Sequence, residues 1–148
     1  MYFNCTILHK ASDSDSKKKK FYYLVDAMTF TEAEANCYKI AKDQNVSDDF
    51  PIDDIAKTNI SMVKRADDSD ELTDKWVHVQ HGIISLDEES GEEVVAKKEE
   101  AIILCSSIDK AVNIPRSDIG NATFVAITSK RTNIVEVYQK DKLDEIEA

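Results

Sequence analysis

The histidines of this chain are the first residues to consider for metal or acid–base chemistry. His78 and His81 lie three residues apart in a strand-like stretch, so their side chains point to opposite faces and do not converge on one ion. Zinc needs a compact set of His, Cys or carboxylate ligands, and no such spacing occurs around these two or around His9. The His-x-Thr/Ser motif of two-histidine phosphoesterases is absent at all three positions. We therefore expect no metal site.

The glycine and nucleophile patterns also argue against catalysis. A phosphate-binding loop needs several glycines close together, but Gly82, Gly91 and Gly120 are isolated. Nucleophile elbows and informative Cys/His pairs are missing, and paired acids such as Asp53-Asp54 resemble solvated carboxylates. We expect no catalytic residue and no cofactor. The sequence predicts a protein that acts by binding and is not an enzyme.

Basic residues beside aromatic residues form the pattern that favours binding. Single-stranded nucleic acid uses aromatic faces for base stacking and cations for its phosphates. The leading hypothesis is an accessory factor of DNA metabolism that contacts single strands or the proteins that handle them. In the alternative interpretation these aromatics are ordinary strand residues that alternate between core and surface. The candidate contacts are Lys17, Lys18, Lys19, Lys20, Tyr22, Tyr23, Lys75 and Trp76.

The net charge of −10 supports a second hypothesis. A strongly acidic protein can occupy the basic groove of a nucleic-acid enzyme, or of a defence enzyme of the host, with carboxylates where phosphates would lie. The acidic runs Asp67–Glu71, Asp87–Glu93 and Asp141–Glu147 are the candidates for that surface. A ligand-sequestering protein, with its site between two halves or at a homodimer interface, remains a third hypothesis. Under each of the first two the partner is a macromolecule.

Length and composition indicate a folded intracellular protein. A chain of 148 residues has the size of one domain. Its longest apolar stretches, such as Ala101–Cys105, fall far short of the ~20 residues that span a bilayer. No secretory signal precedes the first strand, and the three cysteines lack CxxC spacing. We expect reduced thiols, a cytoplasmic location and no membrane association.

An internal repeat determines which elements position these residues. Val25-x-Ala27-x-Thr29-Phe30 recurs as Ile103-x-Cys105-x-Ser107-Ile108, 78 positions later. Lys57-Thr58-Asn59-Ile60 recurs as Arg131-Thr132-Asn133-Ile134, 74 positions later. Such a repeat predicts two similar supersecondary units. We predict a single α+β domain of two pseudo-symmetric strand-strand-helix-strand halves, with about six strands and two main helices on one face. The halves are 1–63 and 75–138, joined by an acidic connector at 65–74 and followed by an acidic tail at 140–148.

Hydrophobic periodicity and turn signals give the element boundaries. In the first half, Thr29 and Glu32 match a capping box for a helix that runs to about Asp43. In the second, Pro115 shortens or breaks the helix that begins at Ile108. The tail could form a frayed helix or be disordered, and we favour disorder. The sequence leaves open whether the halves share one sheet. The expected strands are Tyr2–His9, Phe21–Ala27, part of Phe50–Val63, Trp76–Leu86, Glu92–Cys105, and Thr123–Ile127 with Asn133–Tyr138, which one interpretation joins as an interrupted strand.

The repeat also predicts which side chains form the core. Phe30 opens the apolar stripe of the first helix, so Phe30→Ala is expected to cost about 3–5 kcal/mol. The predicted core residues are Val25, Phe30, Ala33, Cys37 and Ile40 in the first half, and Ile103, Cys105, Ile108 and Ala111 in the second.

One family resemblance covers most of the chain. The stretch Tyr23-Leu24-Val25-Asp26-Ala27-Met28-Thr29-Phe30-Thr31-Glu32-Ala33-Glu34-Ala35, with Trp76-Val77-x-Val79 and Ile83-x-x-Leu86-Asp87-Glu88-x-Ser90-Gly91, resembles a family of short uncharacterised proteins. That family occurs in Bacteroidetes genomes, their mobile elements and their phages. The chain departs from it in the lysine-rich hairpin and near Pro115. The resemblance implies a bacterial or phage setting and assigns no activity or site residue.

Overall fold

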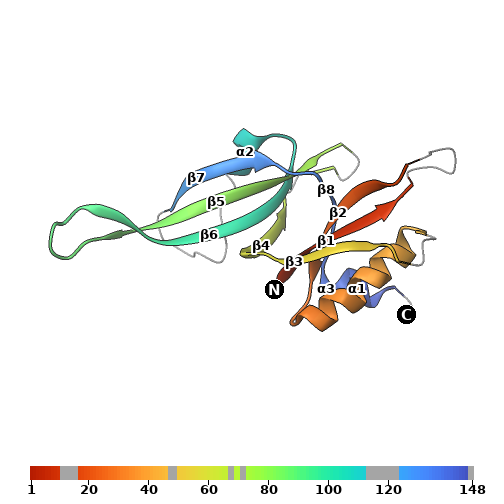
Figure 1. Ribbon diagram of the computed structural model, residues 1–148. Helices are drawn as coiled ribbons and strands as arrows, with labels where there is room; N and C mark the ends of the chain where they lie inside the picture. The colour runs from red at the N-terminus through yellow and green to blue at the C-terminus, as the bar shows by residue number, and fades with distance from the viewer. Residues whose placement is uncertain (11–16, 47–49, 67–68, 71–72, 113–123, 147–148) are drawn as a thin grey trace. The chain divides into compact units, whose positions relative to one another are not determined.

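A computed structural model describes residues 1–10, 17–46, 50–66, 69–70, 73–112 and 124–146, with the backbone alone at 96 and 124–127. Eight strands and three helices lie in this described part (Figure 1). In chain order they are β1 Tyr2–His9, β2 Lys19–Asp26, α1 Phe30–Asp43, β3 Ile52–Lys57, β4 Ile60–Arg65, β5 Lys75–Leu86, β6 Glu93–Cys105, α2 Ile108–Val112, β7 Phe124–Arg131, β8 Ile134–Tyr138 and α3 Lys140–Asp144.

The α+β class is confirmed, and the strands form two separate mixed sheets. One sheet has the order β3-β1-β2-β8 and the other β4-β6-β5-β7. The described strands number eight and not six, because Phe50–Val63 contains two strands and because β7 and β8 belong to different sheets. The chain divides into two compact units: unit 1 is Met1–Asn59 with Asn133–Ala148, and unit 2 is Ile60–Thr132.

Unit 1 packs α1 onto one face of its sheet. Buried residues of α1 recur at helical spacing (Ala33, Cys37, Ile40 and Ala41), and alternate residues of β1 and β2 face them (Phe3, Cys5, Ile7, Tyr23 and Val25). These two periodicities, 3.6 and 2, are what a helix and a sheet need in order to share one core. The predicted burial of Val25, Ala33, Cys37 and Ile40 is confirmed.

Side chains and backbone close both ends of α1. Thr29 Oγ1 accepts a hydrogen bond from the Glu32 amide at 3.1 Å, and the Glu32 carboxylate accepts one from the Met28 amide at 3.1 Å. The box therefore closes one residue earlier than the predicted form. At the other end Asn45 adopts φ 56°, and the amide of Val46 donates to the Ala41 carbonyl at 2.9 Å. This is a Schellman ending, in which asparagine takes the left-handed position usually held by glycine.

The prediction that Phe30 belongs to the core is wrong. Phe30 is the first residue of α1 and is 55% exposed, with only an edge contact to the Phe3 ring at 6.4 Å between centroids. The buried stripe begins one turn later at Ala33, because the first turn of the helix extends past the covered face of the sheet. Ile108, which begins α2, is likewise only partly buried.

The prediction of a disordered acidic tail is also wrong. Residues Lys140–Asp144 form α3, and Leu143 is buried in the same core as α1. Ile146 packs against that core as well. Two apolar residues three positions apart are enough to give this short C-terminal segment an inner face.

In unit 2 the shorter helix α2 contacts β5, β6 and β7. The Ser107 hydroxyl accepts a hydrogen bond from the Lys110 amide at 3.2 Å, as Thr29 does for α1. The predicted Ile103, Cys105 and Ala111 are buried, and the Pro115 prediction lies outside the described residues. The core cluster consists of Ala66, Val77, Val79, Ala101, Ile103, Cys105 and Ala111.

Candidate functional site

The lysine run of the first hairpin is exposed at the start of β2. Lys17, Lys18, Lys19 and Lys20 are all exposed, and Lys20 Nζ lies 3.6 Å from Asp53 Oδ2 on β3. Tyr22 is half-buried. Tyr23 is 1% exposed and meets the Tyr138 ring edge-on at 6.0 Å between centroids. Tyr23 therefore belongs to the core and offers no face on which a base could stack.

In the second predicted pair, Lys75 and Trp76, the lysine is again exposed and the aromatic residue buried. Lys75 is exposed at the start of β5, but Trp76 is only 4% exposed. The guanidinium of Arg65 lies 5.1 Å from the centroid of the indole ring, a cation–π contact that occupies this ring. The structure thus leaves the basic residues of the predicted surface accessible and removes two of its three aromatic rings from it. Lys17–Tyr23 belong to unit 1 and Lys75-Trp76 to unit 2.

The end of the β5–β6 hairpin in unit 2 is exposed. β5 pairs with β6 as far as Leu86 and Glu93, whereas pairing with β7 reaches only Ile83 and pairing with β4 only Glu100. Residues 84–95, here called the arm, therefore have no further strand beside them among the described residues (Figure 1). A register shift between Ile83 and Ile84 marks the base of the arm. Bulges of this kind bend a strand and increase its twist.

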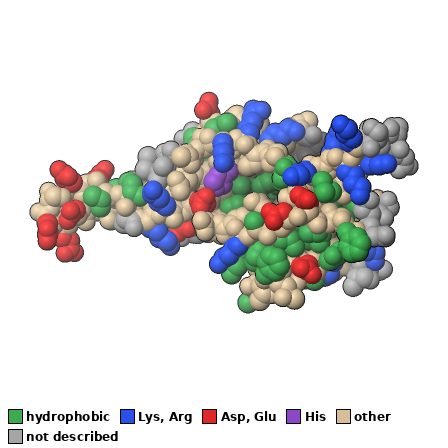
Figure 2. Space-filling view, in the orientation of Figure 1, with side chains coloured by type: hydrophobic (Ala, Val, Ile, Leu, Met, Phe, Trp, Pro, Cys, Tyr) green, Lys and Arg blue, Asp and Glu red, His purple; other side chains and the backbone are tan. Residues whose placement is uncertain are grey.

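The tip of the arm is a structured turn that carries carboxylates. Asp87 Oδ1 accepts from the Glu89 amide at 3.0 Å, and the Gly91 amide donates to the Asp87 carbonyl at 2.8 Å. Gly91 has φ 70°, where a side chain would be strained. All residues of Asp87–Glu93 are exposed, and Figure 2 shows their carboxylates gathered at the end of the arm. The turn thus presents several negative charges in one small, ordered region.

Apolar side chains flank these acids. Leu86 is 67% exposed, Val95 is 45% exposed and Val94 is 41% exposed. Leu86 and Val95 share one face of the arm, because the residue pairs Leu86–Glu93 and Ile84–Val95 lie two positions apart in the register. The sequence identified the acidic run Asp87–Glu93, but not that the hairpin that carries it extends beyond the neighbouring strands. The strand lengths are the signal that would have shown it: 12 and 13 residues in β5 and β6 against 6 and 8 in β4 and β7.

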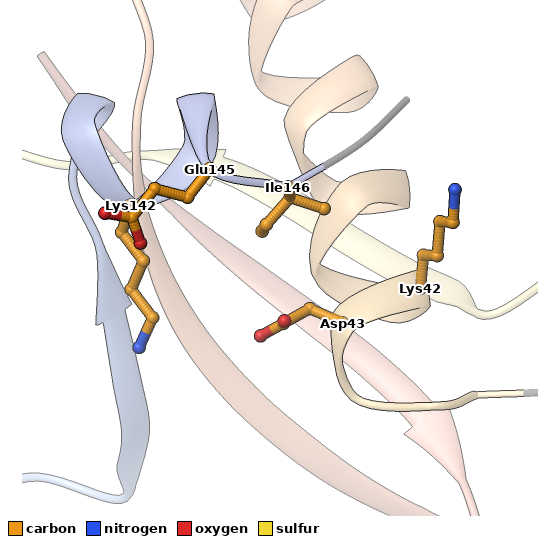
Figure 3. Close-up of a pocket in the computed structure, with 5 residues that line it drawn as sticks. All are labelled: Lys42, Asp43, Lys142, Glu145 and Ile146. Atoms are coloured by element: carbon orange, nitrogen blue, oxygen red, sulfur yellow. The ribbon is translucent and has the colours of Figure 1, made fainter.

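A pocket of about 430 Å³ lies between α1 and α3 in unit 1 (Figure 3). Its lining residues are Lys42, Asp43, Lys142, Glu145 and Ile146. The Tyr138 hydroxyl donates to Asp43 Oδ2 at 2.6 Å and accepts from Nε2 of the Gln44 side chain at 2.7 Å. Lys142 Nζ lies 4.6 Å from the centroid of the Tyr138 ring and 3.3 Å from Glu136 Oε2. Because Asp43 and Lys142 already bind groups of the protein, we assign this pocket to the packing of α3 rather than to a ligand.

Burial of the tyrosines predicts a loss of stability in alkaline solution. Burial raises the pKa of Tyr23 to about 12, and burial together with the hydrogen bond to Asp43 raises the pKa of Tyr138. In the unfolded chain both groups ionise near pH 10. Their contribution is therefore complete below pH 10 and is lost as the pH rises toward 12, because the unfolded chain then binds fewer protons than the folded one.

Urea unfolding between pH 9 and pH 12 measures this dependence. Tyr23→Phe is expected to reduce the decline in unfolding free energy over that interval. Tyr38→Phe, on the exposed side of α1, serves as the matched control and keeps the wild-type decline. An unchanged slope in Tyr23→Phe would contradict the assignment.

Metal ligands do not cluster in the described residues. No group of three or more His, Cys, Asp or Glu side chains suited to an ion occurs there. His78 Nε2 instead lies 2.9 Å from Glu100 Oε1 across neighbouring strands, and all three cysteines are buried as free thiols. None of the helices in the described part of the chain is long and apolar enough to cross a membrane.

Comparison with known proteins gives one match. No curated protein and no solved structure matches this chain significantly. A family model described as "Domain of unknown function (DUF4494)" matches residues 1–140, which is nearly the whole sequence. The chain therefore belongs to the DUF4494 family.

Proposed function

We propose that this protein is a non-enzymatic binding protein whose arm engages a macromolecular partner with a basic surface, namely a protein that handles nucleic acid. One observation carries the proposal: an ordered hairpin, residues 84–95, extends past its neighbouring strands with an acidic tip and exposed apolar flanks. The partner's basic surface would attract the tip, and the apolar residues would be buried on contact.

Charge and shape support this class of partner. The chain carries −10 overall, so it repels nucleic acid at long range and attracts basic proteins. Complementary charge accelerates encounter and selects the partner, while buried apolar side chains at the centre of an interface supply much of the affinity. Leu86 and Val95 provide such a centre beside the carboxylates of Glu88 and Glu89.

The same proposal includes an internal duplication whose copies have diverged at their hairpins. The β1–β2 hairpin carries Lys17–Lys20, whereas the equivalent β5–β6 hairpin carries Asp87–Glu93. This charge difference between the two hairpins supports the proposal that their ends bind partners. A cytoplasmic setting in a phage or mobile element of Bacteroidetes completes the proposal and is supported by the sequence resemblance described above.

Single-stranded nucleic acid remains a second candidate ligand, favoured by the exposure of Lys17–Lys20. With Tyr23 and Trp76 buried, such binding would rest on phosphate contacts more than on stacking. It would then weaken steeply as salt is added, because phosphate contacts release counterions.

Charge reversal in the arm is expected to reduce retention of the partner strongly. The double variant Glu88→Lys/Glu89→Lys replaces two attractions by two repulsions at an exposed site, which we expect to weaken binding by about tenfold or more. Immobilised wild-type and variant proteins would be exposed to nuclease-treated bacterial lysate and the retained proteins identified. We expect nucleic-acid-binding proteins on the wild type, released when single-stranded DNA competes for their basic surface.

The matched control is Glu34→Lys/Asp144→Lys, which changes the net charge equally at two exposed helix positions. It should retain the same proteins as the wild type. Equal loss in both variants would show a general effect of charge and would overturn the role of the arm. Direct binding of a single-stranded oligonucleotide that Lys17–Lys20 variants abolish would favour the second candidate instead.

A further inference from the structure

The two sheets share one plan in which the outer strand comes from the other half of the sequence. In unit 1 the order is β3-β1-β2-β8, and in unit 2 it is β7-β5-β6-β4 when counted from the equivalent edge. The first three strands of each sheet come from one half of the chain. The fourth pairs parallel with β2 or β6 and comes from the opposite half.

The correspondence extends to single residues. Leu24 pairs with Val137 in unit 1, and Ile102 pairs with Val63 in unit 2, at the offsets of 78 and 74 found in the sequence. Both parallel pairings contain a register shift at the same place, after the first paired residue of β8 and of β4. Two independent pairings would not be expected to share a bulge.

The points where the chain leaves each sheet also match. The Thr58 hydroxyl donates to the Tyr2 carbonyl at 2.8 Å, and the Thr132 hydroxyl donates to the Trp76 carbonyl at 2.8 Å. The Thr58 and Thr132 amides bond the same two carbonyls at 3.1 and 3.0 Å. Each threonine thus ends the pairing of β3 or β7, and the next strand begins after a single asparagine, in the other sheet.

Chain length explains why neither half completes its own sheet. To lie beside β2 in the same sheet, strand β4 would first have to cross β1 and β2, a sideways distance of about 14 Å. It would also have to run parallel to β3, so the chain would need to return along the length of a strand, about 20 Å. The link from Lys57 to Ile60 spans at most about 11 Å. The same limit holds between β7 and β8.

We propose that the edge of β2 that β8 covers, and equally the edge of β6 that β4 covers, is a binding edge for one parallel strand of the Ile-x-x-Val type. Ile60-x-x-Val63 and Ile134-x-x-Val137 are the two strands of this type that the pairing registers place there. Each half is therefore an incomplete module whose partner is the last strand of the other half. The intact chain is a covalently joined pair of modules that exchange strands. An open edge supplies unpaired N–H and C=O groups, and the apolar residues fix its register.

The test cuts the full chain without removing any of it. A protease site placed between Asp70 and Glu71, in the connector, allows the folded protein to be cleaved after purification. We expect the two fragments to co-elute at the size of the uncut chain and to separate only in denaturant. Fragments that separate in native buffer after cleavage would overturn the proposal.

A cross-link identifies the exchanged strand directly. In the cleavable chain, Leu24→Cys with Val137→Cys places two thiols on paired residues of neighbouring strands, within the range a disulfide spans. After mild oxidation and cleavage, the fragments should migrate as one band without reductant and as two with it. Leu24→Cys with Val135→Cys is the matched control, because Val135 is 49% exposed and is skipped at the register shift, so it has no paired residue on β2 and should give two bands. Equal cross-linking in both variants, or in neither, would contradict the exchange.

Discussion

Ile40→Ala is expected to destabilise unit 1 by about 2–5 kcal/mol, whereas Phe30→Ala should cost about 1 kcal/mol. Ile40 is fully buried between α1 and the sheet, so truncation leaves a cavity that its neighbours cannot fill without moving. Phe30 is 55% exposed and loses one edge contact and part of its burial. The order of the two losses is opposite to what residue size alone would suggest.

The chain offers a clean measurement of this difference. All five tyrosines lie in unit 1 and the single tryptophan lies in unit 2. Tyrosine fluorescence during urea unfolding therefore reports on unit 1, and tryptophan fluorescence on unit 2. Ile40→Ala should lower the midpoint of the tyrosine transition far more than Phe30→Ala does. Equal losses in the two variants would mean that the first turn of α1 is covered by other residues in solution.

Much of unit 1 could be predicted from local features of the sequence. The 3.6-residue spacing from Ala33 to Ile40 places the helix, and Thr29 with Glu32 places its start. The error at Phe30 arose because periodicity identifies a face of a helix but not how far along that face the sheet extends. The prediction of a disordered tail was wrong for a related reason. The tail offers only Leu143 and Ile146 as large apolar residues, so its burial depends on a core formed by distant segments.

The exchanged strands could not be derived from local pattern. The repeat at Thr58-Asn59 and Thr132-Asn133 was visible, but it does not say which edge the following strand joins. That choice depends on the strand order, which is a feature of the tertiary structure. Only with this order known does the link prove too short for the chain to return to the same sheet. Apolar pairs such as Leu24–Val137 are separated by more than a hundred residues, so no local window contains them.

For the candidate binding residues, too, the local sequence pattern leaves the tertiary environment undetermined. The two-residue period of a strand predicts that Tyr22 and Tyr23 face opposite sides, but not which side is the core. The structure buries Tyr23 and leaves Tyr22 partly exposed. For the acidic run Asp87–Glu93, the sequence predicted a candidate acidic surface, but not that the hairpin that carries it extends beyond its neighbouring strands.

Leu143→Ala is expected to cost unit 1 about 2–5 kcal/mol, although it lies in a helix of only five residues. Leu143 is 3% exposed in the core beside Tyr138, whose ring α3 also covers through Lys142. Tyrosine-detected urea unfolding should show the loss, while the tryptophan transition of unit 2 moves less. Asp144→Ala, the exposed next residue, is the matched control and should change stability by under about 0.5 kcal/mol. If Leu143→Ala proved as mild as Asp144→Ala, α3 would not be part of the folded core. Because Leu143 is buried in the core of unit 1, the acidic charges of the tail should be tested by single exposed substitutions and not by deletion of residues 140–148.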